Sequence, residues 1–261
     1  MEPRAVSLRD GMFQAHLLQG GAGDPLLFLH GAGGLREGEY LDLLAQRFTV
    51  YAPSHPGFGS SEGGEHIEDI IDLALYYHDL MDELKIESAH VVGHSMGGML
   101  AAEVAALCPH RVRRLVLANP VGLWRDDEPV LDFFTFSPEQ LLPYIWHDPG
   151  SEAAKAAYPV PETDEERAEL VFQRTQALAT ASKFLWPIPD RGLHRRIHRI
   201  QAPTLIVWGE SDRLVPASYA EDFRSSIRDS RVVILSECGH LPMLEKRDEF
   251  VALVTEFLLE G

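Results

Sequence analysis

One serine lies in a sequence context that favours nucleophilic chemistry. Ser95 belongs to the motif Gly93-His94-Ser95-Met96-Gly97, which fits the pattern G-x-S-x-G. The apolar run 89–92 before it reads as a strand, and residues 97–102 after it favour a helix. This context is typical of a nucleophile elbow, in which a strained turn exposes the serine hydroxyl. An ordinary glycine-rich turn is the alternative, so the role of Ser95 depends on partners elsewhere in the chain.

The base and the orienting acid that such a serine needs follow two later apolar runs. Asp212 comes shortly after run 204–208, and His240 follows run 232–235. Because the carboxyl ends of parallel strands meet at one edge of a sheet, we expect both side chains to lie near Ser95. His240 would then take the serine proton, and Asp212 would hold the imidazole tautomer. Alone, Asp212 could cap a helix and His240 could be a surface residue, but all three at strand ends favour catalysis.

A glycine-rich stretch provides a candidate oxyanion hole. Residues 30–34, His-Gly-Ala-Gly-Gly, follow the apolar run 26–29. Small residues let the backbone approach the reacting carbonyl, where N–H groups can stabilise the developing charge. We assign one donor to Met96 and the other to Ala32, with Gly33 as the neighbouring option. A phosphate-binding loop is the alternative, but the sequence has no G-x-x-x-x-G-K-[ST] pattern, and no G-x-G-x-x-G opens a helix.

Short apolar runs predict the sheet that must position these residues. Most runs are continuous rather than alternating, as expected for parallel strands buried on both faces. They are the runs 26–30, 48–52, 90–93, 114–118, 204–208 and 232–235. A hairpin is predicted at the start of the chain, where residues 5–9 and 13–18 flank the turn dipeptide Asp10-Gly11. Together they indicate an α/β fold with a mostly parallel, eight-stranded sheet.

Amphipathic runs between the strands predict the helices that cover this sheet. The clearest is 67–84, whose apolar positions follow i, i+3, i+4 and i+7 spacing. Others are expected at 96–107, 217–226 and 248–259. This alternation of strands and helices is typical of a parallel sheet flanked by helices.

The alternation stops in a stretch rich in proline and aromatic residues. Residues 121–187 contain no good buried strand, and we interpret them as a helical lid inserted into a core formed by 1–120 and 188–261. A structureless loop of that length is improbable in a compact domain. We expect some aromatic side chains to form the lid's own core and the others an apolar substrate pocket. The pocket candidates are Trp124, Phe133, Phe134, Trp146, Trp186 and, outside the lid, Leu241.

These residues resemble the α/β-hydrolase superfamily over the whole predicted core. The matching segments are His30-Gly31, Pro56-Gly57-Phe58-Gly59-Ser60-Ser61, 93–97, 203–212 and Gly239-His240. The chain order serine, aspartate, histidine is that of this superfamily, and the lid lies where the family usually inserts one, after the sixth strand. The resemblance implies a Ser-His-Asp hydrolase that forms an acyl-enzyme, with no metal and no organic cofactor. Serine at position 95 argues against the dehalogenase and epoxide hydrolase branches, whose nucleophile is aspartate.

Within the superfamily, the chain is somewhat similar to the meta-cleavage-product hydrolases, which cut carbon–carbon bonds. It shares Ser-Met-Gly-Gly at the elbow and the Pro-Gly-Phe-Gly-Ser segment. It departs at His94, where those enzymes often have Asn, at Leu241, where many have Trp, and at His55, where Asp often precedes Pro-Gly. We therefore expect hydrolysis of a carboxylic ester of a small, largely apolar substrate. The alternatives are C–C bond hydrolysis, a cofactor-free haloperoxidase activity and, in a different class, a ligand-binding protein that keeps the triad.

The composition argues against several classes of partner. The chain has 261 residues, with 23 Lys and Arg against 40 Asp and Glu, and a net charge of −17. Nucleic acids and anionic membranes need positive charge to displace counterions, so a small-molecule substrate is the expected partner. The acidic excess lies mostly in 61–88 and 121–187. Strongly anionic substrates are therefore disfavoured near the lid unless Arg125 or another cation faces inward.

Two further patterns, a pair of histidines and the two cysteines, are better explained by structure than by function. His194 and His198 could share a helix face and bind zinc, but the sequence offers no third ligand nearby, and the surrounding arginines favour a solvated basic surface. Cys108 is expected to be a small buried residue, and Cys238 is not where a nucleophile is expected. Two cysteines make no disulfide framework, which favours a reducing compartment. No apolar run is long enough for a secretory signal or a membrane span, so we expect a cytoplasmic protein.

Overall fold

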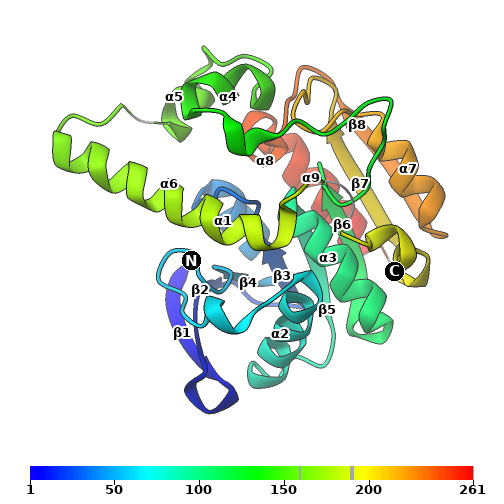
Figure 1. Cartoon of the computed structure of the whole chain (residues 1–261). Helices are drawn as coiled ribbons and strands as arrows, with labels where there is room; N and C mark the ends of the chain where they lie inside the picture. Colours follow the sequence, from blue (N-terminus) through cyan, green and yellow to red (C-terminus); the bar gives the residue numbers. More distant parts are fainter. Residues whose placement is uncertain (159, 189–190, 261) are drawn as a thin grey trace.

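An eight-stranded sheet organises the chain in the computed structural model, which describes residues 1–158, 160–188 and 191–260 (Figure 1). The strand order is β1-β2-β4-β3-β5-β6-β7-β8. The strands are β1 (Glu2–Leu8), β2 (Phe13–Gly20), β3 (Pro25–Leu29), β4 (Thr49–Pro53), β5 (Ala89–His94), β6 (Val112–Ala118), β7 (Thr204–Gly209) and β8 (Ser230–Leu235). β2 pairs antiparallel with both β1 and β4, and the pairs from β4 through β8 are parallel.

The central strands are buried on both faces, which explains their continuous apolar sequences. Every residue of β5 and of β7 is buried. Successive side chains of a strand point to opposite faces, so β3 sends Leu27 and Leu29 into one apolar cluster and Leu26 and Phe28 into another. The two clusters are the two cores of a helix–sheet–helix sandwich.

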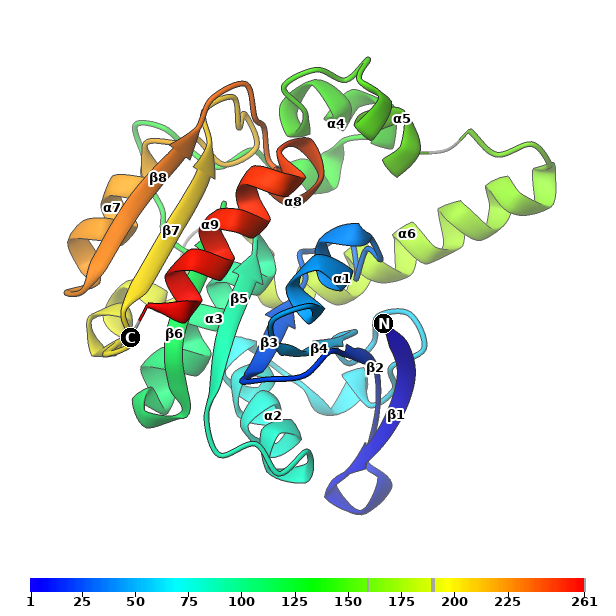
Figure 2. The same cartoon turned by 180° about the vertical axis from the view of Figure 1, so that it is seen from behind.

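Helices cover both faces of the sheet (Figures 1 and 2). The cluster that contains Leu27 includes residues of α2, α3 and α7, and the cluster that contains Leu26 includes residues of α1 and α9. These helices are α1 (Glu39–Ala45), α2 (Ile70–Glu83), α3 (Met96–Leu107), α7 (Tyr219–Ser226) and α9 (Arg247–Leu259), with the short α8 (Pro242–Glu245) directly before α9.

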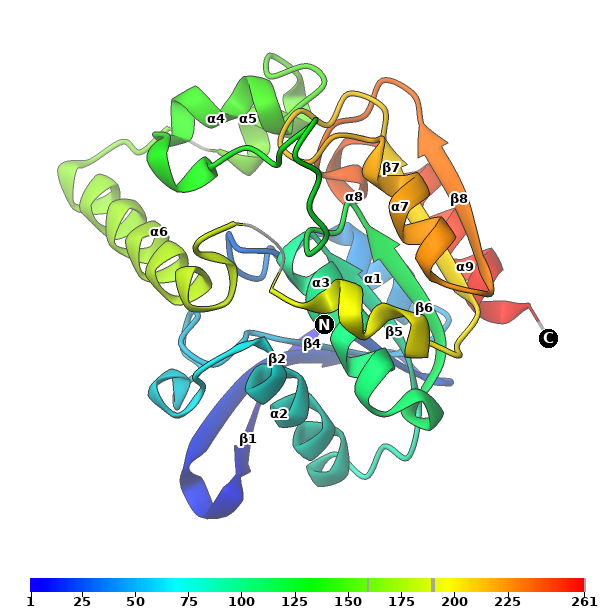
Figure 3. The ribbon, with the colours of Figure 1, turned by 45° about the vertical axis from the view of Figure 1, so that its right-hand side comes forward.

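A helical segment connects β6 to β7. It contains α4 (Pro138–Ile145), α5 (Glu152–Ala157) and α6 (Asp164–Leu185), which lie beyond the carboxyl ends of the parallel strands (Figures 1 and 3). Capping boxes at Ser137 and Thr163 start α4 and α6. Positions 159, 189 and 190, which the sequence assigns to the lid and to the second part of the core, lie outside the described residues. Within the described residues, no helix has the length and apolarity that crossing a membrane requires.

The structure confirms the predicted α/β sheet and the main helices. All six apolar runs overlap parallel strands, and the predicted hairpin joins β1 to β2. α2 begins three residues later than the predicted helix because Asp69 caps it, accepting the N–H groups of Ile71 and Asp72. α1 is not predicted from the sequence, because its seven residues are too few for a clear helical period.

Candidate active site

Three side chains from separate strand ends form one chain of hydrogen bonds. The Oγ atom of Ser95 lies 2.9 Å from Nε2 of His240, and Nδ1 of His240 lies 2.7 Å from Oδ2 of Asp212. All three residues are buried. A neutral imidazole in this chain carries its proton on Nδ1, toward Asp212, and turns its lone pair toward the Ser95 hydroxyl. The sequence-predicted nucleophile, base and acid are therefore in contact.

A strained turn presents the serine between β5 and α3. Ser95 has φ 55° and ψ −117°, a conformation that only glycine adopts without strain. The two glycines of the motif allow the tight packing around it. A Cβ at Gly93 would lie 2.2 Å from the carbonyl oxygen of Gly97, and a Cβ at Gly97 would lie 2.1 Å from that of Leu29. Both contacts are impossible, so the elbow depends on glycine at these positions.

The carboxylate of Asp212 accepts four hydrogen bonds. Its Oδ1 accepts the N–H groups of Leu214 and Val215, each at 2.9 Å, and its Oδ2 accepts His240 and the side-chain amide of Asn119 at 2.7 Å. These donors fix the orientation of the carboxylate. Asn119 is not among the residues that the sequence motifs predict for the site. The signal was available, because Asn119 directly follows β6 in the way that Ser95 directly follows β5.

Three buried, neutral histidines form hydrogen bonds beneath and beside the loops that carry the site: His94, His55 and His30. The Nε2–H of His94 donates to the carbonyl oxygen of His240 at 2.8 Å, and burial lowers the pKa of His94 to about 3. His55 donates from Nε2 to the carbonyl of His30 at 2.9 Å and accepts the hydroxyl of Tyr77 at Nδ1. Burial lowers the pKa of His55 to about 4 and that of His30 well below its usual value. Each ring bond fits a neutral tautomer, and protonation of His30 at Nε2 would remove the acceptor of the His55 backbone N–H.

The candidate oxyanion-hole residues lie at the edge of the elbow. Gly31 packs so closely that a Cβ on it would lie 3.2 Å from the Cβ of Ser95. The next residue, Ala32, is buried, whereas Gly33 is exposed. Met96 is the first residue of α3, where backbone N–H groups have no partner within the helix. In the described part of the chain, no hydrogen bond uses the N–H of Ala32 or of Met96, as the role of oxyanion-hole donor requires.

The candidate pocket residues fall into two groups. Phe133 stacks on Phe134, whose ring meets that of Trp186 edge-on at 5.9 Å. Trp124 packs against the same apolar cluster as this group. Trp146 is fully buried in the opposite cluster, which also contains Leu241. The structure brings the first group together and sets Trp146 and Leu241 apart from it.

The remaining charged and nucleophilic candidates lie outside this arrangement. Arg125 forms ion pairs with Asp127 and Asp222. His194 and His198 belong to two separate short 3-10 turns. In the described ranges, no three His, Cys, Asp or Glu residues are grouped so that they could hold a metal ion. Cys238 is buried, and burial raises the pKa of its thiol, which disfavours the reactive thiolate; Cys108 is half-buried.

The sheet, the elbow and the serine–histidine–aspartate contact together define the α/β-hydrolase class. The model of the Alpha/beta hydrolase family matches residues 26–253, and the chain belongs to this family.

The names of similar proteins refer to several activities. A dihydrolipoyllysine-residue acetyltransferase component of an acetoin cleaving system, from Cupriavidus necator, is 30% identical over 95% of this chain and 67% of its own length. A 2-hydroxy-6-oxo-6-phenylhexa-2,4-dienoate hydrolase from Comamonas testosteroni is 30% identical over 94% of this chain and 91% of its own. The solved structure of a membrane phospholipase A superposes with a TM-score of 0.80 at 25% identity, covering 98% of this chain and 85% of the other.

Proposed function

We propose that the protein is a serine hydrolase that cleaves a carboxylic ester of a small, largely apolar substrate through an acyl-enzyme intermediate. The observation that carries this proposal is the unbroken line of contacts from Ser95 through His240 to Asp212, at 2.9 and 2.7 Å. Such a line makes a serine hydroxyl nucleophilic at neutral pH.

In the proposed reaction, Ser95 Oγ attacks the ester carbonyl while His240 Nε2 takes its proton. The backbone N–H groups of Ala32 and Met96 stabilise the tetrahedral oxyanion. Collapse of this intermediate breaks the bond to the alcohol oxygen, which receives the proton from His240 and leaves. A water molecule then attacks the acyl-enzyme, with His240 again as base, and releases the acid and free Ser95.

The helical segment 121–187 is proposed to be the lid of this site. Its helices lie beyond the strand ends that carry the triad (Figure 3). The apolar group of Phe133, Phe134 and Trp186 fits a pocket for an apolar acyl or alcohol group.

Covalent labelling tests the proposal directly. A fluorophosphonate is expected to modify Ser95 once per chain, and short-chain p-nitrophenyl esters are expected to be hydrolysed. Peptide mapping by mass spectrometry locates the adduct. Absence of both labelling and turnover would contradict the proposal and favour the ligand-binding class.

A second candidate is hydrolysis of a C–C bond in a dienoate, and the names of similar proteins favour it. The Comamonas testosteroni relative and others from Burkholderia cepacia and Pseudomonas putida are named as hydrolases of such compounds. A dienoate carries a carboxylate, and we propose Arg174 on α6 as the cation that would bind it. The Nη2 of Arg174 donates to the carbonyl of Phe136 at 2.9 Å, and its buried Nη1 has no hydrogen-bond partner in the described chain.

Arg174→Gln separates the two candidates. If the substrate is a dienoate held by Arg174, the KM for it should rise by about 10-fold or more, since a charge-assisted hydrogen bond contributes about 1.5–3 kcal/mol. The KM for neutral p-nitrophenyl esters should stay within about threefold. Arg167→Gln, on the exposed part of the same helix, is the matched control. A coloured dienoate that the Arg174→Gln enzyme turns over with an unchanged KM would exclude this role of Arg174.

A further inference from the structure

The carboxylate of Glu245 accepts hydrogen bonds from backbone N–H groups on both sides of the proposed base, His240. Glu245, the last residue of α8, accepts the N–H of Gly239 at 2.9 Å and that of Leu241 at 3.4 Å through Oε1. Its Oε2 accepts the N–H of His147 at 2.8 Å. The residues on both sides of His240 are thus tied to the same side chain.

The same carboxylate joins the loop of His240 to the helical segment between β6 and β7. The N–H of His240 donates to the carbonyl of Ile145, at the end of α4, at 2.6 Å. The ring of His147 contacts the hydroxyl of Ser211 at 2.7 Å. Gly239 lies so close to this segment that a Cβ on it would be 2.2 Å from the carbonyl oxygen of Ile145. Residues 145–147 and the loop 238–241 are therefore joined by hydrogen bonds and by close backbone packing.

We propose that Glu245 is a positioning residue for His240. The ionised carboxylate of Glu245 holds the loop 238–241 against residues 145–147. The inference rests on the proposed function, because it assigns a task to a residue that acts through the proposed base. An ionised carboxylate is an acceptor at both oxygens, so it can hold three N–H donors at once. A neutral side chain of the same shape presents a donor at one of these positions.

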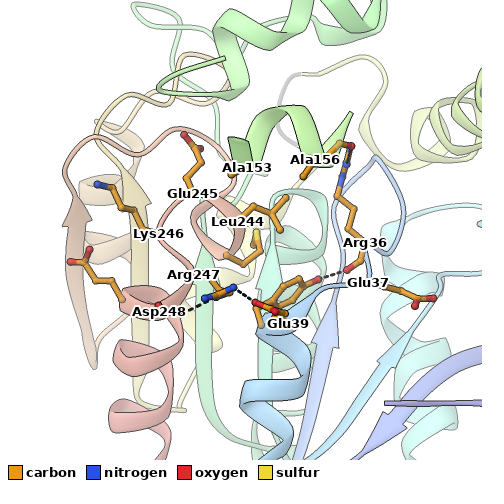
Figure 4. A pocket seen from close by; sticks show the side chains of 14 residues that line it. Arg36, Glu37, Glu39, Ala153, Ala156, Leu244, Glu245, Lys246, Arg247 and Asp248 are labelled. Atoms are coloured by element: carbon orange, nitrogen blue, oxygen red, sulfur yellow. Dashed lines mark hydrogen bonds and ion pairs between the residues drawn. The ribbon is translucent and has the colours of Figure 1, made fainter. Parts of the chain in front are cut away.

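An open cavity of about 760 Å³ gives solvent access to Glu245 (Figure 4). The other charged groups that line it are Arg36, Glu37, Glu39, Lys246, Arg247, Asp248 and Glu249. Arg247 pairs with Glu39 and Asp248, Lys246 pairs with Glu237, and Arg36 donates to a carbonyl of α5. On the protein side, His240, His147 and Cys238 lie close to Glu245. No cation in the described residues forms an ion pair with Glu245.

Burial raises the pKa of Glu245, which the three backbone N–H groups and His240 only partly offset. The side chain is thus protonated at a higher pH than an exposed glutamate. Protonation places an O–H donor against an N–H donor and releases part of the loop. Activity should therefore fall on the acid side for two reasons: the base gains a proton, and one carboxylate oxygen of Glu245 can no longer accept a hydrogen bond.

Glu245→Gln is the test. For a p-nitrophenyl ester, kcat is expected to fall by about 10-fold or more, because small displacements of a catalytic group are costly, while KM stays within about threefold. The acid limb of log(kcat/KM) should be steeper than a slope of one in the wild type and should have a slope of one in the variant. Glu245→Asp, which keeps the charge on a shorter side chain, should recover part of kcat and keep the steeper limb.

Glu249→Gln is the matched control, since it removes the same charge from an exposed residue of the same cavity. Fluorophosphonate titration counts the active sites in each preparation. A merely structural role would lower the melting temperature and the labelled fraction, but would leave kcat per labelled site and the acid limb unchanged. That result would overturn the inference, as would a Glu245→Gln enzyme that matches the Glu249→Gln control. If the wild type itself is neither labelled nor active, the proposed function has failed instead.

Discussion

Replacing Ser95 by alanine should reduce kcat/KM for esters by about 10⁴–10⁶-fold, because triad members act as a unit and the rest of the site leaves only weak catalysis. The hydroxyl that lies 2.9 Å from His240 is lost, and no other nucleophile takes its place. Hydrolysis of p-nitrophenyl acetate and butyrate measures the effect. Intact-protein mass spectrometry should show no fluorophosphonate adduct on the variant.

Two further variants show that the loss is chemical. Ser60→Ala changes an exposed serine and should leave turnover unchanged. Ser95→Gly removes the same nucleophile but suits the φ of 55°, so it should unfold at a higher temperature than Ser95→Ala. An alanine variant that keeps more than a hundredth of wild-type activity, free of contaminating esterase, would remove Ser95 from the mechanism.

The sheet and the triad could be predicted because both follow from strictly local patterns. Runs buried on both faces, such as 204–208, are continuous in apolar residues, and a parallel sheet brings their carboxyl ends together whatever lies between them. Ser95, Asp212 and His240 each follow such a run, so their proximity needed no knowledge of the intervening helices.

The supporting residues could not be predicted in the same way. Asn119 donates to Asp212, and Glu245 accepts the N–H groups on both sides of His240. A lone polar residue after a strand or in a short helix has many plainer roles, so its sequence context does not reveal these contacts. The path of residues 121–187 also lies beyond sequence patterns. Trp146 and Trp186 are similar residues in one aromatic stretch, yet one is fully buried and the other is 49% exposed. Tertiary packing alone decides which aromatic side chain goes where.

Asp212→Asn should lower kcat by about 10⁴-fold through the tautomer of His240. The N–H groups of Leu214 and Val215 both point at Oδ1, so the amide oxygen of the variant must occupy that position. Its NH₂ group then faces Nδ1 of His240, donor against donor. This donor–donor contact is relieved when the imidazole proton moves from Nδ1 to Nε2. Nε2 can then no longer accept the proton of Ser95. Steady-state kinetics and the rate of fluorophosphonate labelling should fall together.

The fold should tolerate this change, which separates it from a structural defect. The Oδ1 atom of Asn119 is buried with no hydrogen-bond partner in the described residues, so rotation of this amide can offer an acceptor to the new NH₂ group at position 212. The melting temperature should therefore stay within a few degrees of the wild type, as for Asp229→Asn, an exposed control. If the Asp212→Asn variant keeps a tenth or more of wild-type kcat, Asp212 does not set the tautomer of His240. If instead it is inactive because it unfolds, the four hydrogen bonds on this carboxylate stabilise the fold more than they orient the base.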